Sequence, residues 1–209
     1  MPAESPIILL CRHGRTELNS PTAPRLRAWE NPPLDKRGIL DAKLAASNLK
    51  RYNPQMIYCS DLMRDTETAN IIANENGNIP FEIDFSFRTA DMGELGGLLD
   101  AEAAPLVEKW YDQPWWTAPG GESNNNFLRR WYNAFDLKFN LAKESPAFRP
   151  TIIVTHGRPI AAIHARSAMI PQKEALMPYP GGIAGVYLDE RGEMKLEFLT
   201  DAEPVSKDQ

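Results

Sequence analysis

The sequence predicts a three-layer α/β/α sandwich, in which helices cover both faces of a mostly parallel central sheet. Short, mainly apolar runs such as 7–11 and 151–155 alternate with longer segments of helical periodicity. Apolar runs of this length are typical of strands that are buried on both faces, and strands that alternate with helices form parallel sheets. In such an open sheet, ligands bind beyond the carboxyl ends of the strands.

The composition is that of an ordinary globular protein. The chain has 209 residues, of which 43% are hydrophobic and 24% charged, and its net charge is −5. We therefore expect a single domain spanning 1–209, without a nucleic-acid partner. Cys11 and Cys59 lack the spacing of a zinc site. The apolar run at 7–11 is too short for a signal peptide, and no stretch reaches the roughly 18 apolar residues of a membrane span, so we expect a cytoplasmic protein without a membrane partner.

The expected elements alternate between strand and helix until a hairpin closes the chain. Ser60 suits a helix N-cap, and Pro159 suits the first position of a helix. The elements are strands at 7–11, 56–59 and 151–155, helices at 38–51, from after Ser60 to 75, at 123–143 and from 159 onward, and hairpin strands at 183–188 and 194–199.

Two of these helices have an apolar face that should pack on the sheet. In the helix at 123–143, aromatic residues recur at every fourth position: Phe127, Trp131, Phe135 and Phe139. In the helix at 38–51, the expected buried face consists of Leu40, Leu44, Ala45 and Leu49.

Each of the three strands predicted to be parallel is followed by residues that bind anions. Residues 12–16 (RHGRT) follow the first strand, residues 60–64 (SDLMR) follow the second, and residues 156–158 (HGR) follow the third. The third histidine of the chain, His164, lies within a predicted helix, where we expect it to pack or to face solvent. Two histidines and several arginines should therefore meet at one edge of the sheet.

Phosphoryl transfer is the chemistry that needs such a set. Guanidinium groups bind phosphate oxygens through paired N–H bonds, and a neutral imidazole can attack phosphorus. A glycine beside each histidine lets the backbone approach the phosphate closely. The spacing of the histidines is not that of a metal site, so we expect no metal.

Five segments together resemble the histidine phosphatase superfamily, in its phosphoglycerate mutase-like branch 1. Residues 12–19 (RHGRTELN) match the family pattern R-H-G-x-T-x-x-N, residues 60–69 (SDLMRDTETA) are similar to S-D-L-x-R-x-x-x-T-A, and residues 154–160 (VTHGRPI) are similar to V-T-H-G-x-x-I. Residues 25–38 and 119–123 (PGGES) are similar to two further family segments. All five stand in family order, so the resemblance implies a phosphoglycerate mutase-like fold.

The resemblance also implies a mechanism and a set of site residues. His13 would be the nucleophile that becomes phosphorylated, and Arg12, Arg64 and His156 would hold the phosphoryl group. Water would then hydrolyse the phosphohistidine, as in a metal-independent phosphomonoesterase of the histidine acid phosphatase type, with a small phosphorylated substrate and no cofactor. Further contacts to phosphate or substrate are expected from Asn19, Thr16, Arg15, Arg25, Arg27 and Gly157.

One position departs from the family pattern. Family members commonly carry a glutamate, in L-x-E-x-x-x-G, that protonates the leaving oxygen, and Thr89 occupies that place here. A threonine cannot protonate an alkoxide near pH 7. Three explanations are open. In the first, Asp91 supplies the proton, with Glu94 as the second choice. In the others, the substrate has a good leaving group that needs little protonation, or the protein binds phosphate without catalysis. Of these we favour Asp91.

Two other functions remain open: a phosphoglycerate-type phosphomutase, and a non-catalytic phosphate-binding or regulatory protein. The segment 90–120 is expected to form a lid over the site. It carries the aromatic residues Trp110, Tyr111, Trp115 and Trp116. These favour a substrate with an apolar or ring-bearing group, but packing within the lid explains them equally well.

Overall fold

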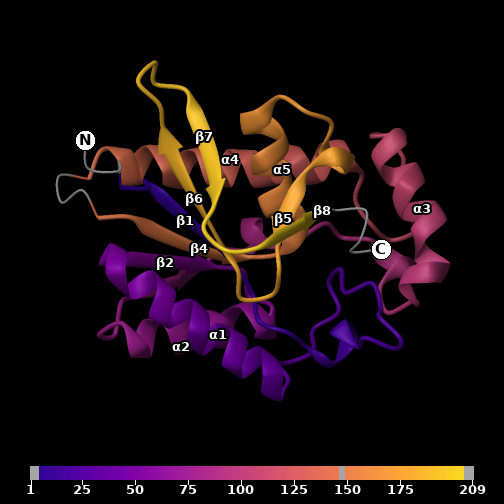
Figure 1. The fold of residues 1–209 in the computed structure, drawn as a ribbon. Helices are drawn as coiled ribbons and strands as arrows, with labels where there is room; N and C mark the ends of the chain where they lie inside the picture. The colour runs from indigo at the N-terminus through magenta and orange to yellow at the C-terminus, as the bar shows by residue number, and fades with distance from the viewer. Residues whose placement is uncertain (1–4, 146–148, 205–209) are drawn as a thin grey trace.

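A six-stranded sheet forms the middle layer of the computed structural model, which describes residues 5–145 and 149–204 (Figure 1). Its strand order is β3-β2-β4-β1-β6-β7, in which the first four strands run parallel and β6 and β7 form an antiparallel hairpin at one edge. β5 and β8 pair separately. The strands are β1 Ile8–Arg12, β2 Met56–Cys59, β3 Phe81–Ile83, β4 Thr151–Thr155, β5 Leu176–Pro178, β6 Ile183–Leu188, β7 Met194–Phe198 and β8 Ala202–Pro204.

Helices cover both faces of the sheet, which confirms the predicted sandwich. α1 and α2 lie on one face, and α4 and α5 lie on the other (Figure 1). The α-helices are α1 Lys36–Leu49, α2 Met63–Glu75, α3 Asp100–Asp112, α4 Asn124–Lys143 and α5 Gly157–Ala168. The 3-10 helices are η1 Glu17–Asn19, η2 Lys50–Tyr52, η3 Phe85–Phe87, η4 Gly93–Leu95 and η5 Gln172–Glu174. Within the described residues, no helix combines the length and apolar character that a membrane span needs.

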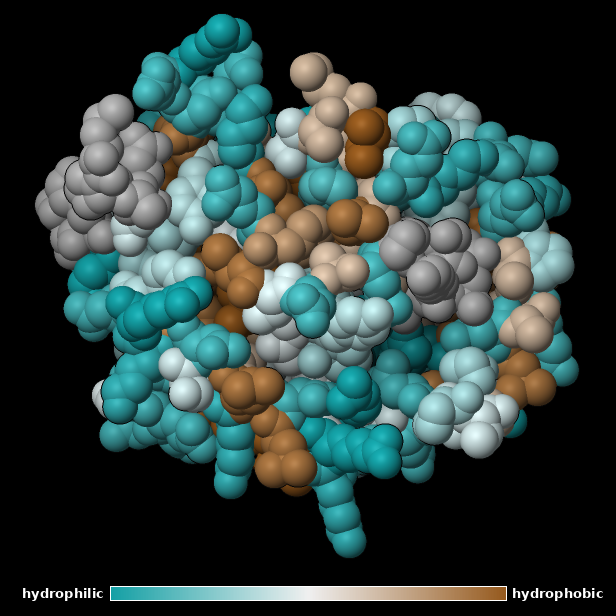
Figure 2. Space-filling model, viewed as in Figure 1, coloured by the Kyte–Doolittle hydropathy of each residue, from teal (hydrophilic) through white to brown (hydrophobic). Residues whose placement is uncertain are grey.

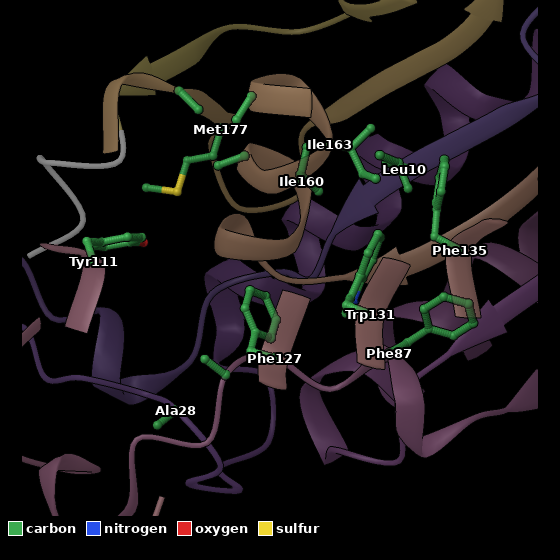
Figure 3. Close-up of a cluster of buried hydrophobic side chains, with 14 of the residues drawn as sticks. Leu10, Ala28, Phe87, Tyr111, Phe127, Trp131, Phe135, Ile160, Ile163 and Met177 are labelled. Atoms are coloured by element: carbon green, nitrogen blue, oxygen red, sulfur yellow. The ribbon is translucent and has the colours of Figure 1, made fainter. Parts of the chain in front are cut away.

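Alternate residues of β1 enter two separate cores. Leu10 packs into the core under α4 and α5, whereas Leu9 packs into the core under α1 and α2. In the first core the predicted aromatic face of α4 is buried, and the rings of Trp131 and Phe135 stack with their centroids 5.6 Å apart (Figure 3). The surface seen from the side of Figure 1 is mostly hydrophilic, with hydrophobic residues in separate patches (Figure 2).

The buried face of α1 agrees with the prediction only in part. Ala45 and Leu49 are buried as predicted, whereas Leu40 and Leu44 are 66% and 64% exposed. Apart from Leu49, only small residues face the interior, because α1 packs closely against α2. The buried residues of α1 are Gly38, Ala42, Ala45, Ala46 and Leu49.

Two helices begin at other residues than predicted. The N-cap of α2 is Leu62, and Ser60 accepts a hydrogen bond from the Leu62 backbone N–H while its hydroxyl donates to Asp65. α5 begins at Gly157, so Pro159 is its third residue. As a result, the first turn of α5 lies close to the carboxyl end of β4, where its backbone N–H groups face that edge of the sheet.

Two glycines let the loop after β1 pack directly on the start of α1. A Cβ atom on Gly14 would lie 2.2 Å from the carbonyl oxygen of Gly38, and one on Gly38 would lie 1.9 Å from the carbonyl oxygen of Arg15. Backbone atoms cannot move aside as a flexible side chain can. This contact therefore holds the segment that carries His13.

We predict that Gly38→Ala destabilises the protein. In an exposed helix interior this change stabilises by about 1 kcal/mol. Here the clash with the Arg15 carbonyl outweighs that gain, and overpacking of this kind costs roughly 1–3 kcal/mol. Urea denaturation should show a lower midpoint for Gly38→Ala and an unchanged or higher one for Ser47→Ala on the exposed side of the same helix. A stabilised Gly38→Ala variant would contradict the packing described.

Candidate active site

A small pocket lies at the carboxyl ends of β1 and β4. Its lining comes from segments that are far apart in the sequence but meet at this edge of the sheet. Arg12 ends β1, Arg64 is the second residue of α2, and His156 stands between β4 and α5. The lining residues are Arg12, His13, Arg27, Ala28, Arg64, Thr89, His156, Gly157 and Arg158.

His13 is held in the form that a nucleophile requires. Its backbone N–H donates to the carbonyl oxygen of Thr155 at 2.9 Å, which ties the end of β1 to the end of β4. Its ring Nδ1 lies 2.7 Å from the carbonyl oxygen of Gly14. A carbonyl only accepts, so Nδ1 carries the proton and Nε2 keeps its lone pair. Burial and then the charge of Arg64 hold the pKa of His13 well below its usual value, so the imidazole is neutral.

His156 faces His13, and a polar side-chain atom lies close to each of its ring nitrogens. The two imidazole centroids are 5.1 Å apart in an edge-to-face arrangement. Nδ1 of His156 lies 3.4 Å from Nη2 of Arg64, and Nε2 lies 2.8 Å from Oδ2 of Asp65. Burial and the nearby guanidinium of Arg64 lower the pKa of His156 well below its usual value.

Backbone carbonyls position the two guanidinium groups that the motifs predicted. Arg64 donates to the carbonyl oxygens of Glu30 and Ala28, at 2.5 and 2.9 Å. Arg12 donates to the carbonyl oxygen of Pro178 at 2.9 Å. Burial lowers the pKa of Arg64 to about 10, so it stays charged at neutral pH. A carbonyl carries no net charge, so these bonds orient the guanidiniums without adding a negative charge. Arg12 also forms an ion pair with Glu203 of β8, with Nη1 and Oε1 4.0 Å apart.

The pocket suits a tetrahedral anion. Four arginines line it, and the first turn of α5 adds backbone N–H groups. A side chain at Gly157 would crowd the pocket, since its Cβ would lie 2.4 Å from Sδ of Met177 and 3.2 Å from Cζ of Arg12. Of the expected contact residues, Gly157 and Arg27 therefore belong to the pocket.

Other expected contact residues lie elsewhere. Arg15 pairs with Asp41 at 3.0 Å, and the Thr16 backbone N–H donates to Oδ1 of Asn19 at 3.0 Å. These three predicted residues border a separate hollow. Arg25 is exposed and donates to the carbonyl oxygen of Gly97, which lies outside the pocket lining.

The structure does not bring Asp91 to the pocket, although Thr89 lines it. Oδ1 of Asp91 accepts a hydrogen bond from the Gly93 backbone N–H at 3.0 Å, so the carboxylate is used within its own loop. Glu94 is exposed and is also absent from the lining. The position of Asp91 follows from the turn at Gly93, where the backbone is left-handed with φ of 50°.

Two residues of the site were not assigned from the sequence. Arg158 lines the pocket. Its position directly after His156 and Gly157 is the sequence feature that could have identified it. Asp65 is fully buried beside the two histidines, and it stands directly after Arg64. With His13 and His156 it forms a set of potential metal ligands whose atoms lie within 4.8 Å of one another. The surrounding guanidinium groups oppose a cation at that place.

The remaining candidate side chains belong to the interior or the surface. Trp110 is buried and donates to the carbonyl oxygen of Glu122, whereas Trp115 is 78% exposed. Cys11 and Cys59 are buried free thiols, and burial raises the pKa of each to about 12, so they are poor nucleophiles. His164 accepts a hydrogen bond from the Leu176 backbone N–H.

Known proteins resemble this chain over most of its length. The family model of the histidine phosphatase superfamily (branch 1) matches residues 8–195. Glucosyl-3-phosphoglycerate phosphatase of Mycolicibacterium vanbaalenii is 29% identical over 174 residues, which cover 78% of this chain and 75% of that protein. A 2,3-bisphosphoglycerate-dependent phosphoglycerate mutase of Methylocella silvestris is 29% identical over 172 residues, which cover 75% of this chain and 79% of the mutase.

Solved structures show the same fold. A mycobacterial glucosyl-3-phosphoglycerate phosphatase in complex with VO3 superposes with a TM-score of 0.75 at 24% identity, covering 91% of this chain and 96% of that one. The sequence motifs, the arrangement of their side chains around one pocket and the family match agree. The chain belongs to branch 1 of the histidine phosphatase superfamily.

Proposed function

We propose that this protein is a metal-independent phosphatase that hydrolyses a small phosphomonoester through a phosphohistidine on His13. The observation that carries this proposal is a neutral, buried imidazole whose Nε2 is unprotonated and which shares one pocket with Arg12, Arg64 and His156. Pure phosphate binding would need the guanidiniums but not a nucleophilic ring. The phosphatase relatives support the same reading.

The reaction has two steps. The phosphate group enters between the guanidiniums of Arg12 and Arg64, which balance its charge and align it with His13. Nε2 of His13 donates its lone pair to phosphorus, and the bond from phosphorus to the leaving oxygen breaks. Water then attacks the phosphohistidine, the P–N bond breaks, and its electron pair returns to Nε2.

The substrate we propose is a small phosphorylated metabolite, whose phosphate group fits a pocket lined by arginines. We further propose that residues 90–120, which contain η4 and α3, act as a lid, and that the protein works in the cytoplasm. The phosphatase relatives act, by name, on glucosyl-3-phosphoglycerate.

A phosphoglycerate-type phosphomutase is the second candidate, because a mutase is among the relatives of similar identity. A mutase must keep its phosphohistidine long enough to return the group to the substrate. Incubation with isotopically labelled phosphoglycerate separates the two: a phosphatase releases labelled inorganic phosphate, whereas a mutase moves the label to another hydroxyl.

We predict that His13→Ala lowers turnover of p-nitrophenyl phosphate by roughly 10³-fold or more, because removal of a nucleophile leaves only binding and charge stabilisation. The wild type, quenched during turnover, should carry an acid-labile, base-stable phosphoryl group on His13. His164→Gln is the matched control, since that histidine lies outside the pocket, and it should keep full activity. Full activity in His13→Ala would refute the proposal.

We also predict that chelators leave turnover unchanged. Charge stabilisation here comes from guanidinium groups, so the reaction needs no Lewis acid. Phosphate release should be equal before and after dialysis against EDTA, and added Mg²⁺ should not raise it. Loss of activity on dialysis, with recovery on addition of a metal, would contradict a metal-independent mechanism.

A further inference from the structure

Asp65 is a buried carboxylate that the mechanism above does not use. It lies in the first turn of α2 and is 0% exposed. Its Oδ2 accepts a hydrogen bond from the hydroxyl of Ser60 and lies 2.8 Å from Nε2 of His156. Its Oδ1 has no hydrogen-bond partner within the described part of the chain. Burying a carboxylate is costly unless a cationic or proton-sharing partner offsets the loss of water.

The contacts of His156 fix where its proton lies. Nη2 of Arg64 can only donate, so Nδ1 of His156, 3.4 Å away, is the accepting nitrogen in the empty site. Nε2 therefore carries the proton and lies 2.8 Å from Oδ2 of Asp65, in an ion-pair contact rather than an aligned hydrogen bond. A carboxylate in this position orients an imidazole and stabilises the imidazolium that forms when the other nitrogen is protonated.

The described residues that line the pocket include no carboxyl group that could act on the leaving oxygen. Within the described lining, Thr89 has no acidic proton to give, and neither Asp91 nor Glu94 takes part. Asp65 does not line the pocket either, so it can act only through His156. Burial raises the pKa of Asp65 to about 6, so the buried pair can take up a proton near neutral pH.

We propose that Asp65 and His156 form a proton-donating dyad that takes the place of the missing glutamate, with Asp65 as the positioning residue and His156 as the acid. This inference rests on the proposed phosphatase function. When a phosphate dianion occupies the N–H groups of Arg64, Nδ1 of His156 is released to carry a proton toward the leaving oxygen. Asp65 stays ionised and balances the imidazolium.

The proton balance closes over the two steps. As Nε2 of His13 bonds to phosphorus, the leaving oxygen takes the proton from Nδ1 of His156 and departs as an alcohol. His156 is then neutral. In the second step Nδ1 accepts a proton from the attacking water, while the P–N bond breaks. The dyad ends with the proton it started with.

The test compares phosphate monoesters whose leaving groups differ in pKa, from p-nitrophenyl phosphate to simple alkyl phosphates. For the wild type, kcat/KM should depend weakly on leaving-group pKa. Asp65→Asn should lose about 10²–10⁴-fold on alkyl phosphates, the usual size of general acid catalysis, but less than about 10-fold on p-nitrophenyl phosphate, whose phenolate needs no proton. Retained activity on p-nitrophenyl phosphate also shows that the variant is folded.

Two neighbouring aspartates serve as matched controls. Asp61 forms an ion pair with Arg88, and Asp91 is used within its own loop. In Asp61→Asn and in Asp91→Asn, kcat/KM should depend on leaving-group pKa as weakly as it does in the wild type. If Asp91→Asn alone makes the dependence steep, the acid is Asp91 and the dyad is wrong. The double variant Asp65→Asn/Thr89→Glu places a carboxyl group at the pocket wall. It should restore the weak dependence of kcat/KM on leaving-group pKa. If the loss in Asp65→Asn came only from a structural defect, the added glutamate would not repair it.

A second variant covers the case in which Asp65→Asn does not fold. His156→Gln should lose more on alkyl phosphates than on p-nitrophenyl phosphate, and an equal loss on both would overturn the dyad. The dyad would also be overturned if Asp65→Asn lost activity equally on both substrates, or if kcat/KM of the wild type depended steeply on leaving-group pKa. Absence of any turnover or phosphohistidine in the wild type would instead refute the proposed function, so the two failures are distinguishable.

Discussion

Two buried guanidinium groups, held by backbone carbonyls, are the interaction on which the pocket depends. Arg64 is tied to the loop before α1 through the carbonyls of Ala28 and Glu30, and Arg12 is tied to β5 through that of Pro178. Removing such charges from water is unfavourable, and carbonyl dipoles offset the loss only in part. In the proposed mechanism, an incoming phosphate offsets this cost further by binding to the guanidinium groups. Their positive charge also keeps His13 neutral, as nucleophilic attack requires, and it keeps His156 neutral as long as no anion is bound.

The same burial explains how proton transfer can be separated from phosphate binding. In the proposed mechanism, side chains at the pocket wall contact the phosphate, whereas Asp65 lies behind His156 and is not among the lining residues. A carboxylate at the wall would repel the phosphate dianion, but one behind an imidazole does so less, because the ring lies between them and shares its proton. Thr89 at the wall and Asp65 in the interior are thus consistent parts of one arrangement.

Much of the fold and the centre of the site could be predicted from the sequence. Parallel strands end at a common edge, so motifs after β1, β2 and β4 had to converge, and Arg12, His13, Arg64 and His156 do so. Asp91 could not be placed in this way, because its position depends on the path of a loop that turns at Gly93. Spacing along α2 likewise does not reveal that Asp65 faces the histidines. Leu40 was misplaced because helical periodicity marks an apolar face without showing how closely a neighbouring helix packs.

Capture of a tetrahedral anion tests the central claim most directly. A crystal structure of the protein with orthovanadate or inorganic phosphate should place the anion within hydrogen-bond distance of Arg12 and Arg64, with its central atom in line with Nε2 of His13. His156 should contact the same anion through Nδ1. An anion found instead in the hollow bordered by Arg15 and Arg37, with the histidine pocket closed to it, would contradict the account.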